Sequence, residues 1–76
     1  MKEILETIIL NLVDNQQQVE ITEEVQEKVV NYSVKVAEAD IGKILGRQGK
    51  TAKAIRMVMK SVAGKEHKKV NIEFVN

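Results

Sequence analysis

The stretch that decides the fold reads Ile41-Gly42-Lys43-Ile44-Leu45-Gly46-Arg47-Gln48-Gly49-Lys50-Thr51-Ala52-Lys53-Ala54-Ile55-Arg56. It sets a G-x-x-G turn between two apolar and basic segments of helical character. Glycine has no Cβ, so a backbone with glycines three positions apart can approach a phosphate closely. Arg47 and Gln48 add a cation and an amide, and a helix expected to begin near Lys50 or Thr51 would direct its free N–H groups to the same place. The stretch therefore predicts a loop that holds a nucleic-acid backbone.

The net charge of +1 hides an uneven distribution of charge along the chain. Residues 1–40 contain three basic and nine acidic residues, a net charge of −6, whereas residues 41–76 contain nine basic and two acidic residues, a net charge of +7. A local positive field of this kind attracts polyanions, and here it is centred on the glycine turn. A solvated lysine-rich helix face would explain the charge alone, but its coincidence with G-x-x-G favours nucleic acid.

Length and composition set the class of protein. A chain of 76 residues with 43% apolar residues is enough for one domain with a single core. The absence of cysteine excludes disulfides and thiolate metal sites. The first ten residues are too acidic for a signal peptide, and no stretch approaches the roughly 18 apolar residues of a membrane span. We expect an uncleaved cytoplasmic protein.

Hydrophobic periodicity predicts the elements before the turn. Apolar residues at helical spacing predict a helix over residues 2–14. Alternation of apolar and polar residues predicts a short strand over about 18–24 and a second over 28–37, joined as a hairpin through Glu24 to Glu27. Asp40 is expected to cap a short helix that begins at Asp40 or Ile41 and ends after Leu45, at Gly46.

Beyond the turn, one more helix and one more strand are predicted. The helix ends near Gly64, and its expected buried stripe is Ile55, Val58, Met59 and Val62. Its basic residues lie on another face: Lys50, Lys53, Arg56 and Lys60. A strand over about 68–75 completes the order α-β-β-α-α-β. This order predicts an α+β fold, a three-stranded sheet with helices packed on one face.

The order of elements and the motif resemble a KH domain. A G-x-x-G turn inside a β-α-α-β core, preceded by a helix and a strand, is similar to the type II arrangement of that domain. The turn with its flanking residues, followed by Ala63-Gly64-Lys65 and a closing Lys69-Val70-Asn71-Ile72-Glu73 strand, resembles the KhpA group, small bacterial proteins made of a lone KH domain. The resemblance implies one KH domain over residues 1–76, with a helix and strand in 1–25 and the G-x-x-G core in 28–76.

The resemblance implies that the chain clamps about four nucleotides of single-stranded RNA. Gly46 and Gly49 would shape the turn, Arg47 and Lys50 would meet phosphates, and Gln48 would offer an amide to sugar or phosphate. A positive rim would be formed by Lys43, Lys53 and Arg56. Bases would lie on an apolar floor, for which Ile44 and Leu45 are the first candidates, ahead of Val34 or Val36. Ile44 and Leu45 could equally be ordinary core. One Tyr and one Phe offer little surface for base stacking, so recognition should depend on apolar contacts and hydrogen bonds.

Other functions fit the sequence less well. Gly49-Lys50-Thr51 imitates the end of a phosphate-binding P-loop, but the required first glycine is replaced by Ile44. His67 is the only histidine, so it has no partner ligand for a metal site and is expected in a solvated turn. The glutamates of the first strand and hairpin are expected to be a solvated edge. A helix-turn-helix would have no place for the three strands. We predict no enzyme, no cofactor and no metal.

Two functions of different kinds remain. The first is an RNA-binding module that acts as an RNA chaperone or post-transcriptional regulator. The second is a protein-interaction or dimerisation subunit with secondary RNA binding, for which Ala54 and Met57 could form an exposed apolar patch. The resemblance to the KhpA group implies homodimers, pairing with a larger KH protein of the KhpB kind, and a link to cell-envelope and cell-length control. Neither a membrane nor a small-molecule substrate is expected.

Overall fold

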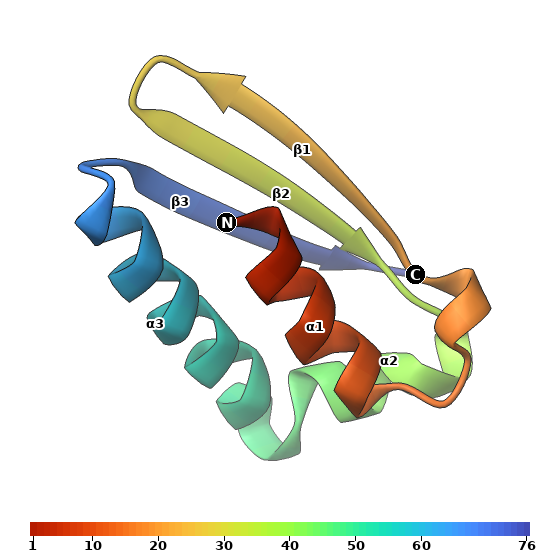
Figure 1. Ribbon diagram of the computed structural model, residues 1–76. Coiled ribbons are helices and arrows are strands. Elements are labelled where there is room, and N and C mark those ends of the chain that lie inside the picture. The colour runs from red at the N-terminus through yellow and green to blue at the C-terminus, as the bar shows by residue number, and fades with distance from the viewer.

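The computed structural model describes residues 1–76 and contains three helices and one three-stranded sheet (Figure 1). The elements, in chain order, are α1 (Lys2–Leu12), β1 (Glu20–Gln26), β2 (Val29–Lys35), α2 (Glu38–Leu45), α3 (Lys50–Lys65) and β3 (Lys69–Val75). Short 3-10 turns at Gln16–Gln18 and Arg47–Gly49 precede β1 and α3. The predicted α-β-β-α-α-β order is confirmed. None of the helices has the length and apolar character needed to cross a membrane.

The sheet has the order β1-β2-β3 and is mixed. β1 and β2 form an antiparallel hairpin in which Thr22 lies opposite Ser33, whereas β2 and β3 are parallel, with Tyr32 opposite Ile72. The parallel pair requires a crossover, and α2 and α3 supply it. The three helices cover one face of the sheet, as predicted (Figure 1). Both β1 and β3 are therefore edge strands.

The core lies between this face of the sheet and the helices. Tyr32, the largest fully buried side chain, lies on β2, and its hydroxyl donates a 2.7 Å hydrogen bond to Glu23 on β1. Burial, reinforced by this bond, raises the pKa of Tyr32 well above its usual range. The buried cluster comprises Leu5, Ile9, Val13, Val30, Tyr32, Val34, Val36, Ile44, Ile55, Met59 and Ile72.

Several predicted element ends are shifted by one or two residues. α1 ends at Leu12 rather than residue 14, β1 begins at Glu20 rather than residue 18, and α3 continues through Gly64 to Lys65. The hairpin turn is tighter than predicted, because the strands extend to Gln26 and Val29. Such shifts are expected, since side-chain periodicity defines the middle of an element better than its ends.

The prediction that Asp40 caps α2 is wrong. α2 begins at Glu38, with Ala37 at the N-cap position, so Asp40 lies within the first turn. Its side chain is buried, and its carboxylate accepts hydrogen bonds from the backbone N–H groups of Asp14 and Asn15, at 3.2 and 3.0 Å. Asp40 therefore holds the segment after α1 against α2, a long-range role that sequence spacing cannot show.

The predicted buried stripe of α3 is partly wrong. Ile55 and Met59 are buried, but Val58 is 47% exposed, and Val62 is only half-buried. The buried face is completed instead by two small residues, Ala52 and Ala63. Both alanines are buried although they are small, so a stripe of large apolar residues does not include them.

Candidate nucleic-acid interface

The G-x-x-G turn adopts an unusual backbone conformation. Gly46 has φ 71° and ψ 179°, Gln48 has φ 57° and ψ 28°, and Gly49 has φ 75° and ψ 12°. The conformation of Gly46 is open essentially only to glycine, whereas the left-handed conformation of Gln48 and Gly49 is accessible to other residues at a cost. Three residues of four with positive φ reverse the chain between α2 and α3.

Gly46 is required for a second reason, because α3 begins directly against it. A Cβ on Gly46 would meet the side chain of Thr51 and would lie 2.8 Å from the Thr51 backbone nitrogen. A Cβ on Gly49 would meet nothing within 4 Å. Gly46 therefore allows the turn to close, while Gly49 leaves open space above the turn.

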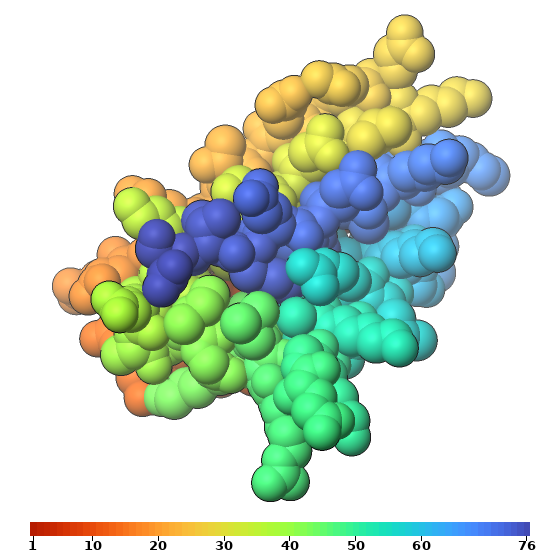
Figure 2. All heavy atoms as spheres, turned by 180° about the vertical axis from the view of Figure 1, so that it is seen from behind, coloured from red at the N-terminus to blue at the C-terminus, as the bar shows by residue number.

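The side chains of the turn project from the body of the molecule (Figure 2). Arg47, Gln48, Lys50 and Lys53 are all exposed, and none of the three cations among them forms a salt bridge. The N–H groups of Gly49 and Lys50 already bond to the carbonyls of Gly46 and Arg47. These two amides therefore already donate hydrogen bonds within the turn, and an anion would be bound by the exposed side chains instead.

Lys43 differs from the other predicted cations because it is paired with acids. Its amine forms a salt bridge with Asp14 and lies 3.7 Å from Asp40. The hydrogen bond to Asp14, more than any other contact, raises the pKa of Lys43. Lys43 therefore supports the segment after α1 and contributes little free positive charge to the predicted rim.

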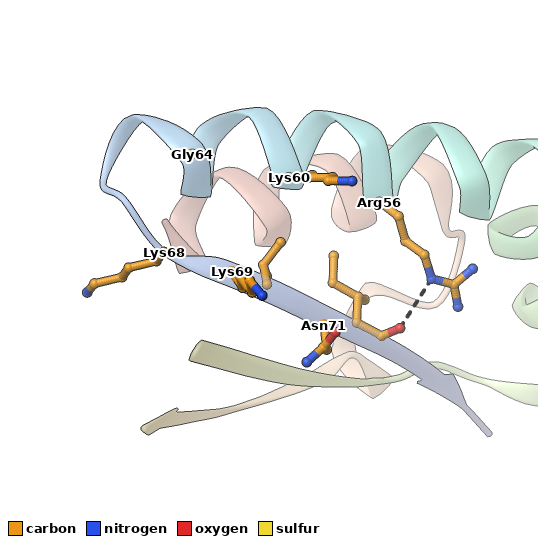
Figure 3. A pocket seen from close by; sticks show the side chains of 8 residues that line it. Arg56, Lys60, Gly64, Lys68, Lys69 and Asn71 are labelled. Carbon is orange, nitrogen blue, oxygen red and sulfur yellow. Dashed lines mark hydrogen bonds between the residues drawn. The ribbon is translucent and has the colours of Figure 1, made fainter. Parts of the chain in front are cut away.

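Arg56 is held in a fixed position beside β3. Its Nε donates a 3.3 Å hydrogen bond to the carbonyl of Ile72 (Figure 3). Its guanidinium carbon lies 5.0 Å from the centre of the Phe74 ring. The cation–π contact and the hydrogen bond restrain a side chain that is otherwise flexible. The remaining guanidinium N–H groups make no hydrogen bond within the protein and are free for a ligand.

The predicted apolar floor is mostly core. Ile44 and Val34 are 0% exposed and Val36 is 3% exposed, so none of them can contact a base without disturbing the core. Leu45 is 40% exposed and lies directly before the turn. Of the four candidates, only Leu45 is therefore available as an apolar contact for a base.

A basic cleft that the sequence did not predict lies between α3 and β3. It has a volume of about 630 Å³, and four cations contribute to its lining: Arg56, Lys60, Lys68 and Lys69. No acidic residue lines it. The periodicity of α3 predicts that Lys60 lies on the basic face of that helix. Lys68 and Lys69 line the same cleft only because β3 runs back alongside α3.

These features agree with the comparison of the chain with known families. Residues 2–74 match the KH domain of KhpA and KhpB. The chain belongs to the KhpA/KhpB KH-domain family. The predicted resemblance and the type II KH fold are thereby confirmed, and as a member of this family of binding domains the chain is not an enzyme.

Curated relatives match the chain from end to end. A protein of Clostridium acetobutylicum named RNA-binding protein KhpA is 45% identical over 99% of this chain and 100% of its own length. Proteins of the same name from Chlamydia trachomatis and Listeria monocytogenes are 43% and 36% identical over 99% of this chain, and over 96% and 99% of their own lengths. No solved structure matches the chain.

An apolar hollow lies on the opposite flank of α3, against α1. Thr7, Ile8, Asn11 and Leu12 of α1 line it, together with Thr51, Ala54, Ile55 and Val58 of α3. Of the two residues predicted for a partner interface, Ala54 lines this hollow, whereas Met57 is 64% exposed but is not part of it. The sequence predicts the correct helix for this apolar surface but not the correct face of it, because it places the exposed Val58 in the core.

Proposed function

We propose that the chain binds single-stranded RNA by clamping about four nucleotides at the G-x-x-G turn, as KH domains do. The observation that supports this most is the turn itself: two positive-φ glycines present Arg47, Gln48 and Lys50 outward with no carboxylate to neutralise the cations. Relatives of similar length carry the name RNA-binding protein. Because the proposed ligand is RNA, we propose that the protein acts in the cytoplasm.

Within this proposal, phosphates and bases contact different groups. Arg47 and Lys50 bind phosphates, Gln48 hydrogen bonds to sugar or phosphate, and Lys53 extends the positive surface. Leu45 supplies an apolar contact for a base, and the guanidinium of Arg56 supplies hydrogen-bond donors. Because no exposed aromatic ring flanks the turn, stacking contributes little, and affinity depends strongly on salt.

A small site of this kind suits weak binding to many RNAs. The cellular role we propose is therefore that of an RNA chaperone or post-transcriptional regulator. Joining two copies, or one copy and a larger KH protein, would raise affinity through effective concentration without any new contact to RNA.

The loop assignment is tested by replacing Arg47 and Gln48 together with Asp. Two carboxylates at the turn repel phosphate, so we expect at least a tenfold loss of affinity for a short single-stranded RNA, measured by fluorescence anisotropy in 50 mM KCl. The matched control is Lys35→Asp with Gln17→Asp, which changes the net charge equally at exposed positions outside the turn. Circular dichroism and Tm should stay unchanged in both variants. Equal affinity of the two variants would show that the turn is not the binding site.

The position of RNA on the protein can be read from backbone amide shifts. Titration of isotopically labelled protein with a randomised short RNA should shift amides clustered between Lys43 and Lys53. Shifts confined to α1 and β1 would contradict the proposal.

The apolar hollow between α1 and α3 favours a second function, assembly with another KH domain. We propose that a second copy of the chain, or a KhpB-like protein, covers Leu12, Ala54 and Val58. Val58→Asp places a charge in the hollow at an exposed position, so it should weaken assembly and leave the fold intact. Sedimentation velocity, alone and with the larger KH protein, measures this. Assembly unaffected by the substitution would exclude this face.

A further inference from the structure

β1 is a free edge of the sheet that takes no part in either proposed function. It is the outermost strand in the order β1-β2-β3, and no element lies beyond it (Figure 1). A strand at an edge leaves a row of N–H and C=O groups unpaired, and these groups can pair with another chain. We propose that β1 binds an extended basic segment of a partner protein, which adds to the sheet as a fourth strand. Neither the G-x-x-G turn nor the hollow between α1 and α3 includes a residue of β1.

The first argument is that β1 lacks most of the features that keep an edge strand from pairing. Proteins protect such edges with proline, lysine, a bulge, a short strand or a covering element. β1 is seven residues long, and its register with β2 runs without a bulge from Glu20 opposite Lys35 to Gln26 opposite Val29. The chain contains no proline, and β1 contains no lysine. All residues of β1 are exposed except Ile21, which is half-buried. The backbone of β1 is therefore open to pairing along its length.

The second argument is the charge of the strand, which selects the kind of partner. Glu20, Glu23 and Glu24 lie on β1, and none of them forms a salt bridge. If two copies of β1 paired antiparallel about Thr22, Glu20 would lie opposite Glu24. If they paired about Glu23 or Glu24, that glutamate would lie opposite itself. Like charges directly opposite one another destabilise a strand pair, and the same carboxylates repel RNA. Lysine or arginine in the added strand would instead attract them.

The third argument is that the two faces of β1 differ, which sets the pattern of the added strand. Val25 lies opposite the buried Val30, so it is on the face of the sheet that the helices cover, yet it is 55% exposed. Successive side chains of a strand point to opposite faces, so Glu20 and Glu24 lie on the other face. A strand that alternates apolar and basic residues would cover Val25 on one face and pair with both glutamates on the other.

An acidic hollow on the outer face of the sheet offers a place for one basic side chain of the added strand. Its only charged residues are Glu24 and Glu73, and Oε1 of Glu24 accepts a 2.6 Å hydrogen bond from Gln26. Adjacent strands are about 4.8 Å apart, so a lysine on a strand added beyond β1 can extend its long stem over β1 to this hollow. The hollow has a volume of about 170 Å³ and is lined by Thr22, Glu24, Asn31, Tyr32, Ser33 and Glu73.

The test uses a fluorescent heptapeptide in which lysine and valine alternate, beginning and ending with lysine. In Glu20→Gln with Glu24→Gln, we expect the affinity for this peptide, measured by anisotropy in 50 mM KCl, to fall about fivefold, because two exposed ion pairs are lost. The matched control, Glu6→Gln with Glu66→Gln, removes the same charge at exposed positions outside the sheet and should change affinity less than about twofold. Equal affinities of the two variants would overturn the inference.

Backbone pairing is separated from attraction between charges by two further peptides, N-methylated either at every valine or at every lysine. In an extended strand the N–H groups of alternate residues point to opposite edges, so each peptide loses the donors of one edge and keeps its charge. One of them should bind like the parent peptide and slow hydrogen exchange at β1, whereas the other should bind at least fivefold more weakly. If the two bind equally, no fourth strand forms. Protection of β1 that rises with protein concentration in the absence of peptide would assign this edge to a second copy of the chain and would also overturn the inference.

Discussion

Asp40 shows how one residue joins distant parts of this chain. Its carboxylate accepts three hydrogen bonds from Asp14 and Asn15, including one from the Asn15 side chain at 3.0 Å, and lies near the amine of Lys43. α2 leads directly into the G-x-x-G turn, so the residues that fix α2 also fix the start of the turn. Hydrogen bonding by the Asn15 backbone, the strongest influence, lowers the pKa of Asp40.

Replacing Asp40 with Ala should therefore destabilise the fold. The substitution leaves backbone N–H groups without their acceptor, and we expect Tm to fall by about 10 °C at pH 7. Glu38→Ala, an exposed acid in the same helical turn, is the control and should change Tm little.

The pH dependence of Tm tests the same interaction. Because the folded-state pKa of Asp40 lies below its unfolded value of about 3.9, its stabilisation is present above that value and is lost as pH falls through the folded-state pKa. The difference in Tm between the parent and Asp40→Ala should thus shrink below about pH 4. A difference that stays constant down to pH 2 would contradict this account.

Gly46 gives a second prediction at the scale of the residue. Gly46→Ala places a side chain in a conformation that only glycine favours, against Thr51, and should cost roughly 3 kcal/mol of folding free energy. Gly42→Ala lies in α2 with open space around it and should stabilise by about 0.5–1 kcal/mol. Urea unfolding measures both, and equal effects would show that the turn tolerates a Cβ.

At the scale of elements, the sequence predicted more of the fold than of the surface. Element order, the position of the turn and the start of α3 at Lys50 follow from periodicity and from two glycines. The residues that were misplaced are those whose role depends on a partner remote in sequence. The sequence predicts that Asp40 caps its own helix, but Asp40 holds the segment after α1; it predicts that Lys43 is a free cation, but Lys43 pairs with Asp14.

In the candidate site, too, residues that are neighbours in sequence are predicted correctly, and those brought together by the fold are not. Local chemistry identified Arg47, Gln48 and Lys50, because the turn is continuous in sequence. The cleft could not be found from the sequence, since it forms only where β3 returns beside α3 and brings Lys69 near Lys60. The prediction of the apolar floor for bases is mostly wrong for a related reason. Apolar residues next to the turn can lie either in the core or at the surface, and only the packing of the folded chain shows that Ile44 is buried and Leu45 is exposed.

The revised buried face of α3 makes a prediction about two adjacent residues. Met59→Ala removes a side chain with no exposure and should cost about 3 kcal/mol in urea unfolding. Val58→Ala, at a half-exposed position, should change the free energy of unfolding by less than about 0.5 kcal/mol. If the two substitutions cost the same, the face of α3 that packs on the sheet has been misassigned.

At the scale of the whole molecule, the acidic first half and the basic second half of the chain supply opposite edges of the sheet. β1, at one edge, carries Glu20, Glu23 and Glu24, all exposed, whereas β3, at the other edge, borders the basic cleft. Adjacent strands are about 4.8 Å apart, so the two edges are separated by roughly 10 Å. That distance is close to the Debye length of about 10 Å in 0.1 M salt. The acidic edge therefore weakens the positive field in dilute salt and is largely screened at higher salt.

Neutralising the acidic edge should thus speed RNA capture only when salt is low. Glu20→Gln with Glu24→Gln leaves Glu23 and its bond to Tyr32 intact, and should raise the association rate for a short RNA about two- to fivefold in 50 mM KCl. In 500 mM KCl the Debye length falls to about 4 Å, and the rates should converge. Stopped-flow fluorescence measures both conditions. A faster association rate that persists in high salt would mean that the glutamates contact RNA directly. An unchanged association rate in low salt would mean that the charge of the acidic edge does not affect how RNA approaches the positive side of the molecule.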